Sequence, residues 1–541
     1  MTTALPDLPE GYYLDNFRRL LDTVVDRYDD LLSPDDRDFV KRFRALNQAP
    51  ARLLVRLYTR KGPFFRRDKL NYPEIPDLDA ALTDLAQSGL VDLSPELTAG
   101  ELARLLTLAE LRRLDWLPDR KAAKAVLLEM LDEWPDVQPA SDWQVDIPIL
   151  LPRHWLTLRR LQLMYFGNEY QSLTDFVLSD LGLFQYEPYS LDRRQRRFNT
   201  ALEIDQQLAL NDLKAEYYQA QENGDRDTLL QLAGDLLRDD WCESIRDRLD
   251  RLRNRVGFRL EQWGELDTAL ALFQTNDQPP ARERRCRIDY KAGRYQIAWD
   301  TLQQLRDRPR DATEIRFGQR FMPRLARKLS QPVDPDPVHA PIEHRACWPR
   351  GNGSVEQLAC EHLPDSVWLE NLLPLGVFGL IHWDLVFREV PGAFHHPFQQ
   401  GPADLHDPDF LNRRGTSPQR LYRELTARDA RDRIRRHWSA KFGRFNPFVH
   451  WAALDETLVL RCFDTVPWEH WVAIFHHLWL DLRRHRAGFP DLFQFRPGQD
   501  AGYRFIEIKG PGDRLQDNQR DWLAVFSEAG IPAEVWYVDY A

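Results

Sequence analysis

The chain has 541 residues, of which 43% are hydrophobic and 29% charged, and its formal net charge is −11 at pH 7. This length predicts several domains, and the acidic balance excludes a protein coated in positive potential, so any contact with nucleic acid must rest on local basic patches. No apolar run reaches the roughly 18 residues of a membrane span, and the N-terminus lacks a signal-peptide pattern. The five cysteines form no CxxC pair. We therefore expect a cytoplasmic protein with no membrane partner.

Residues 1–93 predict helices followed by a short winged element. Residues 12–28 are amphipathic, and 89–93 are typical of a brief strand. Basic side chains crowd one part of this region: Arg52, Arg56, Arg60, Lys61, Arg66 and Arg67. A helix–turn–helix with a wing and a basic cluster predicts a DNA-binding domain that contacts phosphates. Two further basic clusters lie at residues 193–197 and 428–444.

Residues 94–199 predict short helices joined by a turn, with Arg120 and Lys121 beside them. This pattern is similar to a SAP-type DNA-binding helical hairpin, although a plain helical connector fits it equally well. Residues 200–335 carry one apolar helical stripe after another and predict tetratricopeptide-like repeats, which form a scaffold rather than a catalytic part. A proline-rich linker follows, and 13 of the 14 histidines lie beyond His154, all of them after this linker.

The most informative pattern lies near the C-terminus, where Asp491 follows a turn and Glu507-Ile508-Lys509 follows sixteen residues later. Side chains two apart on a strand share a face, so Glu507 and Lys509 emerge together. If the strand after Asp491 pairs with this one, two carboxylates and an ammonium meet on one surface. Such a group suits metal-assisted phosphodiester hydrolysis, because carboxylates hold Mg²⁺ or Mn²⁺ and a lysine steadies the nucleophile.

The residues after this strand predict a supporting helix and a further strand. Asp513 with Gln516 three residues later favours a helix start, and Gln519 lies within its apolar stripe. Gly530 predicts the end of the helix, and 533–538 predicts a strand. The whole segment is therefore expected to form a compact α/β unit with Gln519 beside the carboxylates, or as a satisfied buried amide.

Two other polar groups compete with this site. His344, Cys347, Cys360 and His362 could be read as zinc ligands, but the second pair is spaced by one residue, which structural zinc sites rarely use. The histidines and aspartates between 395 and 409 lie in a loop without regular ligand spacing, which favours capping and packing roles. There is no Walker-type loop and no GxSxG elbow.

At Gly488-Phe489-Pro490-Asp491 and at Glu507-Ile508-Lys509-Gly510-Pro511-Gly512 the chain resembles the VRR-NUC nuclease domain. The upstream Leu369-Glu370 is similar to the same family's acidic position. On these motifs, and on further matches along nearly the whole chain, the protein resembles bacterial members of the Fanconi-associated nuclease family.

The resemblance implies a multidomain, mostly α protein whose residues 336–541 form an α/β restriction-endonuclease-like PD-(D/E)xK nuclease domain. It implies that Glu370, Asp491, Glu507 and the carbonyl of Ile508 ligate Mg²⁺ or Mn²⁺, with two ions bound. Lys509 is then the catalytic lysine and Gln519 assists it. Arg483 and Arg486 match basic positions that face DNA phosphates.

The implied activity is that of a phosphodiesterase I type hydrolase, a 5′-flap endonuclease and 5′-to-3′ exonuclease in interstrand crosslink repair. Its partners are then flapped or branched DNA, with other repair proteins recruited through the repeats, in a bacterial nucleoid. Animal members carry a lysine where this chain has Asn518, so the 5′-phosphate contact stays open. A four-way-junction resolvase and a non-catalytic DNA-binding scaffold are the alternatives.

Overall fold

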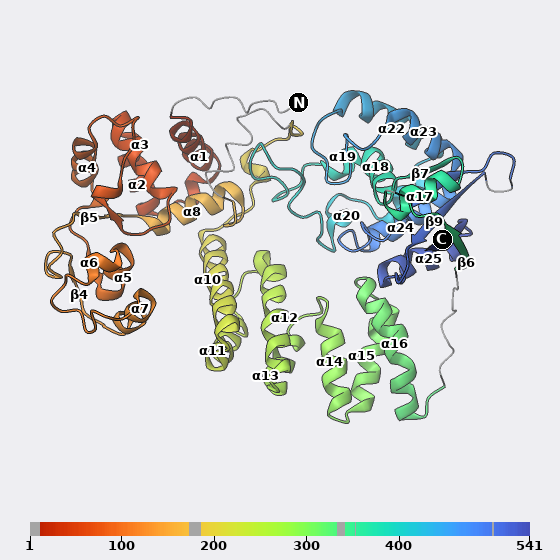
Figure 1. Cartoon of the computed structure of the whole chain (residues 1–541), viewed down its shortest axis with the longest axis horizontal. Helices are drawn as coiled ribbons and strands as arrows, with labels where there is room; N and C mark the ends of the chain where they lie inside the picture. Colours follow the sequence, from red (N-terminus) through yellow and green to blue (C-terminus); the bar gives the residue numbers. More distant parts are fainter. Residues whose placement is uncertain (1–10, 172–184, 333–340, 352, 500–501) are drawn as a thin grey trace. The chain divides into compact units, whose positions relative to one another are not determined.

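The structure, a computed structural model, describes residues 11–171, 185–332, 341–351, 353–499 and 502–541 (Figure 1). The linker expected after residue 331 lies almost wholly outside the described residues. The chain divides into one unit within 1–184 and 191–205 and a second within 185–190 and 206–541. Within the described ranges, no helix is both long enough and apolar enough to cross a membrane.

The first unit begins with a helical layer closed by a small sheet. Its elements are α1 (Tyr12–Tyr28), α2 (Pro34–Arg44), α3 (Gln48–Tyr58), α4 (Leu78–Gln87), α8 (Trp155–Phe166) and a sheet of order β1 (Phe65–Arg66), β5 (Ile149–Pro152), β2 (Val91–Asp92). Ser33 starts α2 because its side chain accepts from the backbone N–H of Asp36, whose carboxylate accepts from Ser33 in return. The strand β2 falls where the sequence predicts the wing.

A second core of this unit holds the segment that resembles a SAP hairpin. Its elements are β3 (Glu96–Thr98), α5 (Ala99–Leu105), α6 (Leu108–Leu111), α7 (Lys124–Asp132) and β4 (Val137–Pro139), with β3 and β4 antiparallel. Capping boxes at Thr98 and Thr107 start the two short helices. Leu102, Leu111 and Trp143 are buried together in the core that holds these helices and strands together.

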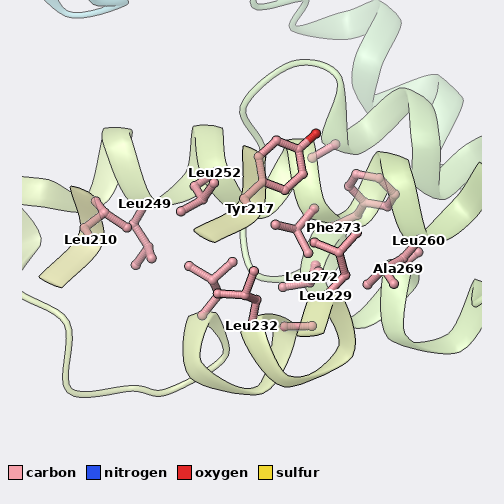
Figure 2. Packing of buried hydrophobic residues seen from close by; sticks show 14 of the residues in the cluster. Leu210, Tyr217, Leu229, Leu232, Leu249, Leu252, Leu260, Ala269, Leu272 and Phe273 are labelled. Carbon is pink, nitrogen blue, oxygen red and sulfur yellow. The ribbon is translucent and has the colours of Figure 1, made fainter. Parts of the chain in front are cut away.

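The second unit begins with helices that pack in consecutive pairs. They are α10 (Ala201–Asn223), α11 (Arg226–Leu236), α12 (Arg246–Gln262), α13 (Leu266–Gln274), α14 (Ala281–Lys291), α15 (Tyr295–Asp307) and α16 (Ala312–Leu329). Figure 2 shows Leu229, Leu232 and Leu272 in one shared apolar core. Close packing is visible at Gly257, where an added Cβ would lie 3.1 Å from the Phe273 ring.

The C-terminal part of this unit is built on a five-stranded mixed sheet. Its strands are β6 (Ile342–Trp348), β7 (Ser366–Trp368), β8 (Leu492–Phe495), β9 (Tyr503–Lys509) and β10 (Ala533–Tyr540), in the order β6-β10-β9-β8-β7. The strand β10 lies between β6 and β9 and is parallel to both, whereas β8 is antiparallel to β7 and β9. This sheet in a mostly helical chain confirms the expected fold class.

Most of the helices around the sheet lie in the long connection between β7 and β8. One more lies between β6 and β7, and another between β9 and β10. These helices are α17 (Val355–His362), α18 (Leu372–Ile381), α19 (Trp383–Val386), α20 (Phe410–Arg413), α21 (Pro418–Glu424), α22 (Ala427–Lys441), α23 (Glu456–Thr465), α24 (Trp468–Leu480) and α25 (Asp517–Ala529). Gly530 ends α25 with φ +69°, as its position predicts.

The start of α25 differs from the prediction. The helix cap is Gln516, which forms a capping box with Gln519, and not Asp513. The carboxylate of Asp513 is instead engaged by the backbone N–H of Gly510 at 3.1 Å, which closes the turn after β9. Asp513 thus closes the turn after β9, and the helix cap falls three residues later.

Candidate active site

Asp491 and Glu507 lie opposite each other where β8 begins. The antiparallel register pairs Leu492 with Ile506, which places Asp491 across from Glu507 one step earlier. An Asp491 carboxylate oxygen accepts from the backbone N–H of Ile508 at 2.8 Å. The predicted hairpin is therefore confirmed, and it brings the two carboxylates to one end of the sheet.

Glu507 is the centre of a group of buried polar side chains. It is only 1% exposed, and the same oxygen, Oε1, lies 2.7 Å from Lys509 Nζ and accepts from Gln519 Nε2 at 2.6 Å. The amide oxygen of Gln519 accepts from the backbone N–H of Gln516 at 2.9 Å. Because that bond fixes the amide, its NH₂ group must face Glu507. The supporting role predicted for Gln519 therefore has a definite geometry.

The electrostatics of this group favour a bound cation. Burial raises the pKa of Asp491 to about 6, and the nearby Glu356 and Glu370 carboxylates add to the rise. Burial also raises the pKa of Glu507 to about 8, with the Asp491 charge as the next cause, although Lys509 opposes it. Burial and carboxylate repulsion thus disfavour the charged forms of both groups, and a divalent ion would offset that repulsion.

The third carboxylate, Glu370, is close to this group but turned partly away. The backbone N–H groups of Leu369 and Glu370 both donate to the Asp491 carbonyl, at 3.1 and 2.9 Å. Glu370 has φ +42°, and its Oε1 accepts from the indole N–H of Trp368 at 2.7 Å. Across the described residues, no three His, Cys, Asp or Glu side chains gather into a ready metal cage. The oxygen donors present, with the Ile508 carbonyl, are nonetheless of the type that Mg²⁺ or Mn²⁺ prefers.

Comparison with known proteins gives this arrangement a family. A family model described as VRR-NUC domain matches residues 425–540, and one described as FAN1, HTH domain matches residues 11–92. A Fanconi-associated nuclease 1 homolog from Pseudomonas aeruginosa is 36% identical over 98% of this chain and 97% of that protein. The chain belongs to the Fanconi-associated nuclease family.

More distant relatives and a solved structure agree with this assignment. The homolog from Arabidopsis thaliana is 24% identical over 96% of this chain and 66% of that protein. A crystal structure of paFAN1 bound to 2nt 5′flap DNA with gap has a TM-score of 0.85 and 36% identity, covering 99% of this chain and 100% of that one. The family resemblance drawn from the sequence is confirmed. This Fanconi-associated nuclease is a DNA nuclease, and its family implies dependence on a divalent metal ion.

Glu356 is the site carboxylate that the sequence reasoning missed. It lies in the first turn of α17, and its charge raises the pKa of both Asp491 and Glu507. The preceding Val355 packs in the same apolar cluster as Ile508, which brings α17 beside β9. The capping box of Ser354 and Gln357 marks the helix start in the sequence, but only the tertiary packing shows that it reaches the site.

The predicted basic residues of the N-terminal unit fall into two groups. Arg66 is only 6% exposed and makes bidentate ion pairs with Glu110, at 2.7 and 2.8 Å, and with Asp68, at 2.8 and 3.0 Å. Arg52, Arg56 and Arg67 also have acidic or carbonyl partners, on Glu74 and Asp79. Arg60 and Lys61 are exposed, with Arg60 donating to the Tyr72 hydroxyl at 3.1 Å.

The basic pair predicted beside the active site is partly engaged within the protein. Arg486 donates to the Pro447 carbonyl at 2.9 Å, whereas Arg483 is exposed. Burial, and then the charges of Arg483 and Arg486, lower the pKa of His406, although Asp481 opposes them. Phosphate contacts by Arg483 and Arg486 stay a prediction.

Asn518, where this chain departs from the animal members of the family, packs against the turn before Asp491. Gly488 has φ +88°, and an added Cβ there would lie 2.6 Å from the Asn518 amide nitrogen. The Asn518 Oδ1 also accepts from the backbone N–H of Gln519 at 3.1 Å. Asn518 therefore lies in close contact with Gly488, whose backbone has the left-handed conformation.

The two histidines considered as zinc ligands, His344 and His362, contact other side chains. His344 Nε2 lies 3.1 Å from Glu534 Oε2, and its ring stacks on Trp536. His362 packs edge-on against Trp348. Asp404 in the second competing group forms ion pairs with Arg413 and Arg414, in keeping with the packing role expected of that loop.

Proposed function

We propose that this nuclease cuts DNA at 5′ flaps and trims it in the 5′-to-3′ direction, in repair of interstrand crosslinks at the bacterial nucleoid. The observation that carries the proposal is the buried Asp491–Glu507 pair with Lys509 and Gln519 bonded to the same Glu507 oxygen. The 5′flap DNA held by the similar paFAN1 structures supports the choice of substrate.

Asp491, Glu507, Glu370 and the Ile508 carbonyl would hold two Mg²⁺ or Mn²⁺ ions, and such ions would supply Lewis acidity and positive charge at the phosphate. Glu370 would join them through its second carboxylate oxygen, because Oε1 accepts from the Trp368 indole N–H. Lys509 orients or deprotonates the attacking water from its place beside Glu507. Gln519 keeps the Glu507 carboxylate in one orientation, so the ligand set needs little rearrangement before cleavage.

The other parts of the chain serve substrate binding in this proposal. Residues 1–93 hold duplex DNA, 94–199 form a SAP-like binding region, 200–335 are tetratricopeptide-like repeats and 336–541 are the nuclease domain. Arg60, Lys61, Arg483 and Arg486 are the basic residues best placed to contact phosphates, whereas Arg52, Arg56, Arg66 and Arg67 support the first domain through their carboxylate or carbonyl partners. The outer faces of the repeats would receive other repair proteins.

A panel of end-labelled substrates tests the proposal. Strands with a 5′ flap, a 3′ flap or a four-way junction are incubated with the protein and Mg²⁺, Mn²⁺ or a chelator. We expect cleavage near the branch of the 5′ flap, with either metal and not with the chelator. Symmetrical cuts in the four-way junction by a dimer would instead favour the resolvase alternative.

A further inference from the structure

A tryptophan lies beside the active site with its ring open to solvent. Trp368 is the last residue of β7, an edge strand of the sheet, and pairs with Leu492 of β8. Its side chain is 40% exposed, whereas Trp383, Trp471 and Trp522 of the same unit are almost fully buried. An exposed indole at an open sheet edge gains little for the fold, because its apolar surface stays in water.

The indole N–H of the same ring forms a hydrogen bond with an active-site carboxylate. The indole N–H donates to Glu370 Oε1 at 2.7 Å, and the backbone N–H of Glu370 donates to the Asp491 carbonyl at 2.9 Å. The ring is therefore one hydrogen bond from one predicted metal ligand, and two residues along the chain from it. A nucleotide whose phosphate reached this carboxylate group would bring its base into reach of the ring.

We propose that Trp368 is a nucleotide-stacking residue, whose ring receives the base next to the scissile phosphate and whose N–H positions Glu370. This inference rests on the proposed nuclease function and adds the feature that selects the DNA. A base can stack on a side chain only after it leaves its neighbours in the duplex, and stacking accepts any base. The enzyme would therefore favour branch points and ends, where an unpaired or frayed base is available, with no sequence preference.

A fluorescent base tests the stacking role. Flap DNA carries 2-aminopurine beside the cleaved phosphate, and binding is measured in Ca²⁺, where no cleavage is needed. We expect wild-type protein to quench the 2-aminopurine emission, and W368A to lose the quenching and bind about ten-fold more weakly. The matched control is Y540A, since Tyr540 is an aromatic residue of similar exposure, 37%, at the end of β10. Equal quenching and affinity in W368A and wild type would overturn the stacking role.

A second comparison changes the DNA and leaves the protein intact. An abasic site replaces the base, and we expect it to weaken binding by wild-type protein about ten-fold, which is the loss expected of W368A. Because W368F keeps a ring, we expect the abasic site to weaken its binding as much as it weakens that of wild type. Wild-type affinity that ignores the abasic site would overturn the proposal.

The positioning role separates from stacking in W368F, which keeps a ring but lacks the indole N–H. We expect W368F to bind flap DNA within about three-fold of wild type and to cut it about ten-fold more slowly in single-turnover reactions. A wild-type rate in W368F would overturn the positioning role. If wild-type protein cut no flap substrate with Mg²⁺ or Mn²⁺, the proposed function would fail, whereas the quenching would still report on stacking.

Discussion

Gln519 donates its amide N–H to the Glu507 carboxylate at 2.6 Å, and its amide oxygen is held by the Gln516 backbone. One side chain thus starts α25 and orients a carboxylate of the active site. Because this capping box fixes the first turn of α25, the Gln519 side chain has little freedom to move away from β9. The capping box therefore acts as part of the active site as well as of the fold.

Replacing this amide should affect cleavage more than stability. Q519E keeps an oxygen for the Gln516 N–H but removes the donor to Glu507 and adds a like charge. We expect kcat on flap DNA to fall about 10- to 100-fold, because a group that orients a metal ligand is lost. The control is Q357E, since Gln357 has the same capping-box role in α17. A wild-type kcat for Q519E would contradict the role given to this residue.

Two arginines of α16 should stabilise α25 to different extents. Arg316 lies 3.5 Å from both Asp517 and Asp521 and is 20% exposed, whereas Arg320 pairs with Asp517 but is 67% exposed. Exposed ion pairs contribute little, because solvent screens them. We expect R316A to lower the free energy of unfolding by about 1 kcal/mol and R320A to leave it almost unchanged. Denaturant unfolding checks the order, and a larger loss in R320A would contradict it.

Acid should destabilise the second unit through its buried histidines. Burial lowers the pKa of His382 to about 3 and that of His477 to about 3, with His485 adding to the effect on His477. The unfolded chain takes up these protons near pH 6.5 and the folded chain does not, so stability is present above pH 6.5 and is lost as the pH falls below it.

At pH 5 each of these histidines should cost about 2 kcal/mol of stability. The thermal midpoint is therefore expected to fall between pH 7.5 and pH 5.0, and to fall less in H477Q than in wild type. H450Q is the control, because His450 is exposed. An equal fall in H477Q and wild type would show that His477 is not a cause.

The basic cluster of the first unit should separate into structural and DNA-contacting residues. Arg66 is buried and pairs with the partly exposed Asp68 and Glu110, so R66A removes charge-assisted hydrogen bonds and should cost about 2 kcal/mol of stability. K61A should leave stability unchanged and reduce the slope of log Kd against log salt by about one. Binding titrations at several salt concentrations and thermal unfolding of both variants check this division. A reduced salt slope in a folded R66A would contradict it.

The features that local sequence pattern determines were predicted well. The alternation in β9 places Glu507 and Lys509 together, and the antiparallel pairing of β8 with β9 sets Asp491 across from Glu507. Gly530 ends α25 where expected. Each of these depends on residues a few positions apart, where strand periodicity and glycine chemistry decide the outcome.

The features that depend on distant pairing were not predictable from one sequence. Arg66 looks like a phosphate-binding residue until Glu110, 44 positions away, is found against it. Glu356 reaches the site only because α17 packs on β9, and Glu370 comes beside Asp491 because its backbone N–H donates to the Asp491 carbonyl. The cap of α25 is a local difference, since Asp513 closes the turn after β9 and Gln516 caps the helix.

The most direct test of the central claim is single-turnover cleavage of labelled 5′-flap DNA by D491A with saturating Mg²⁺ or Mn²⁺, alongside binding measured in Ca²⁺. Asp491 is the carboxylate that the β8–β9 hairpin places against Glu507, so its loss should abolish cleavage while Kd stays within about three-fold of wild type. Cleavage by folded D491A at a rate close to wild type would place the reaction elsewhere in the protein and contradict the account.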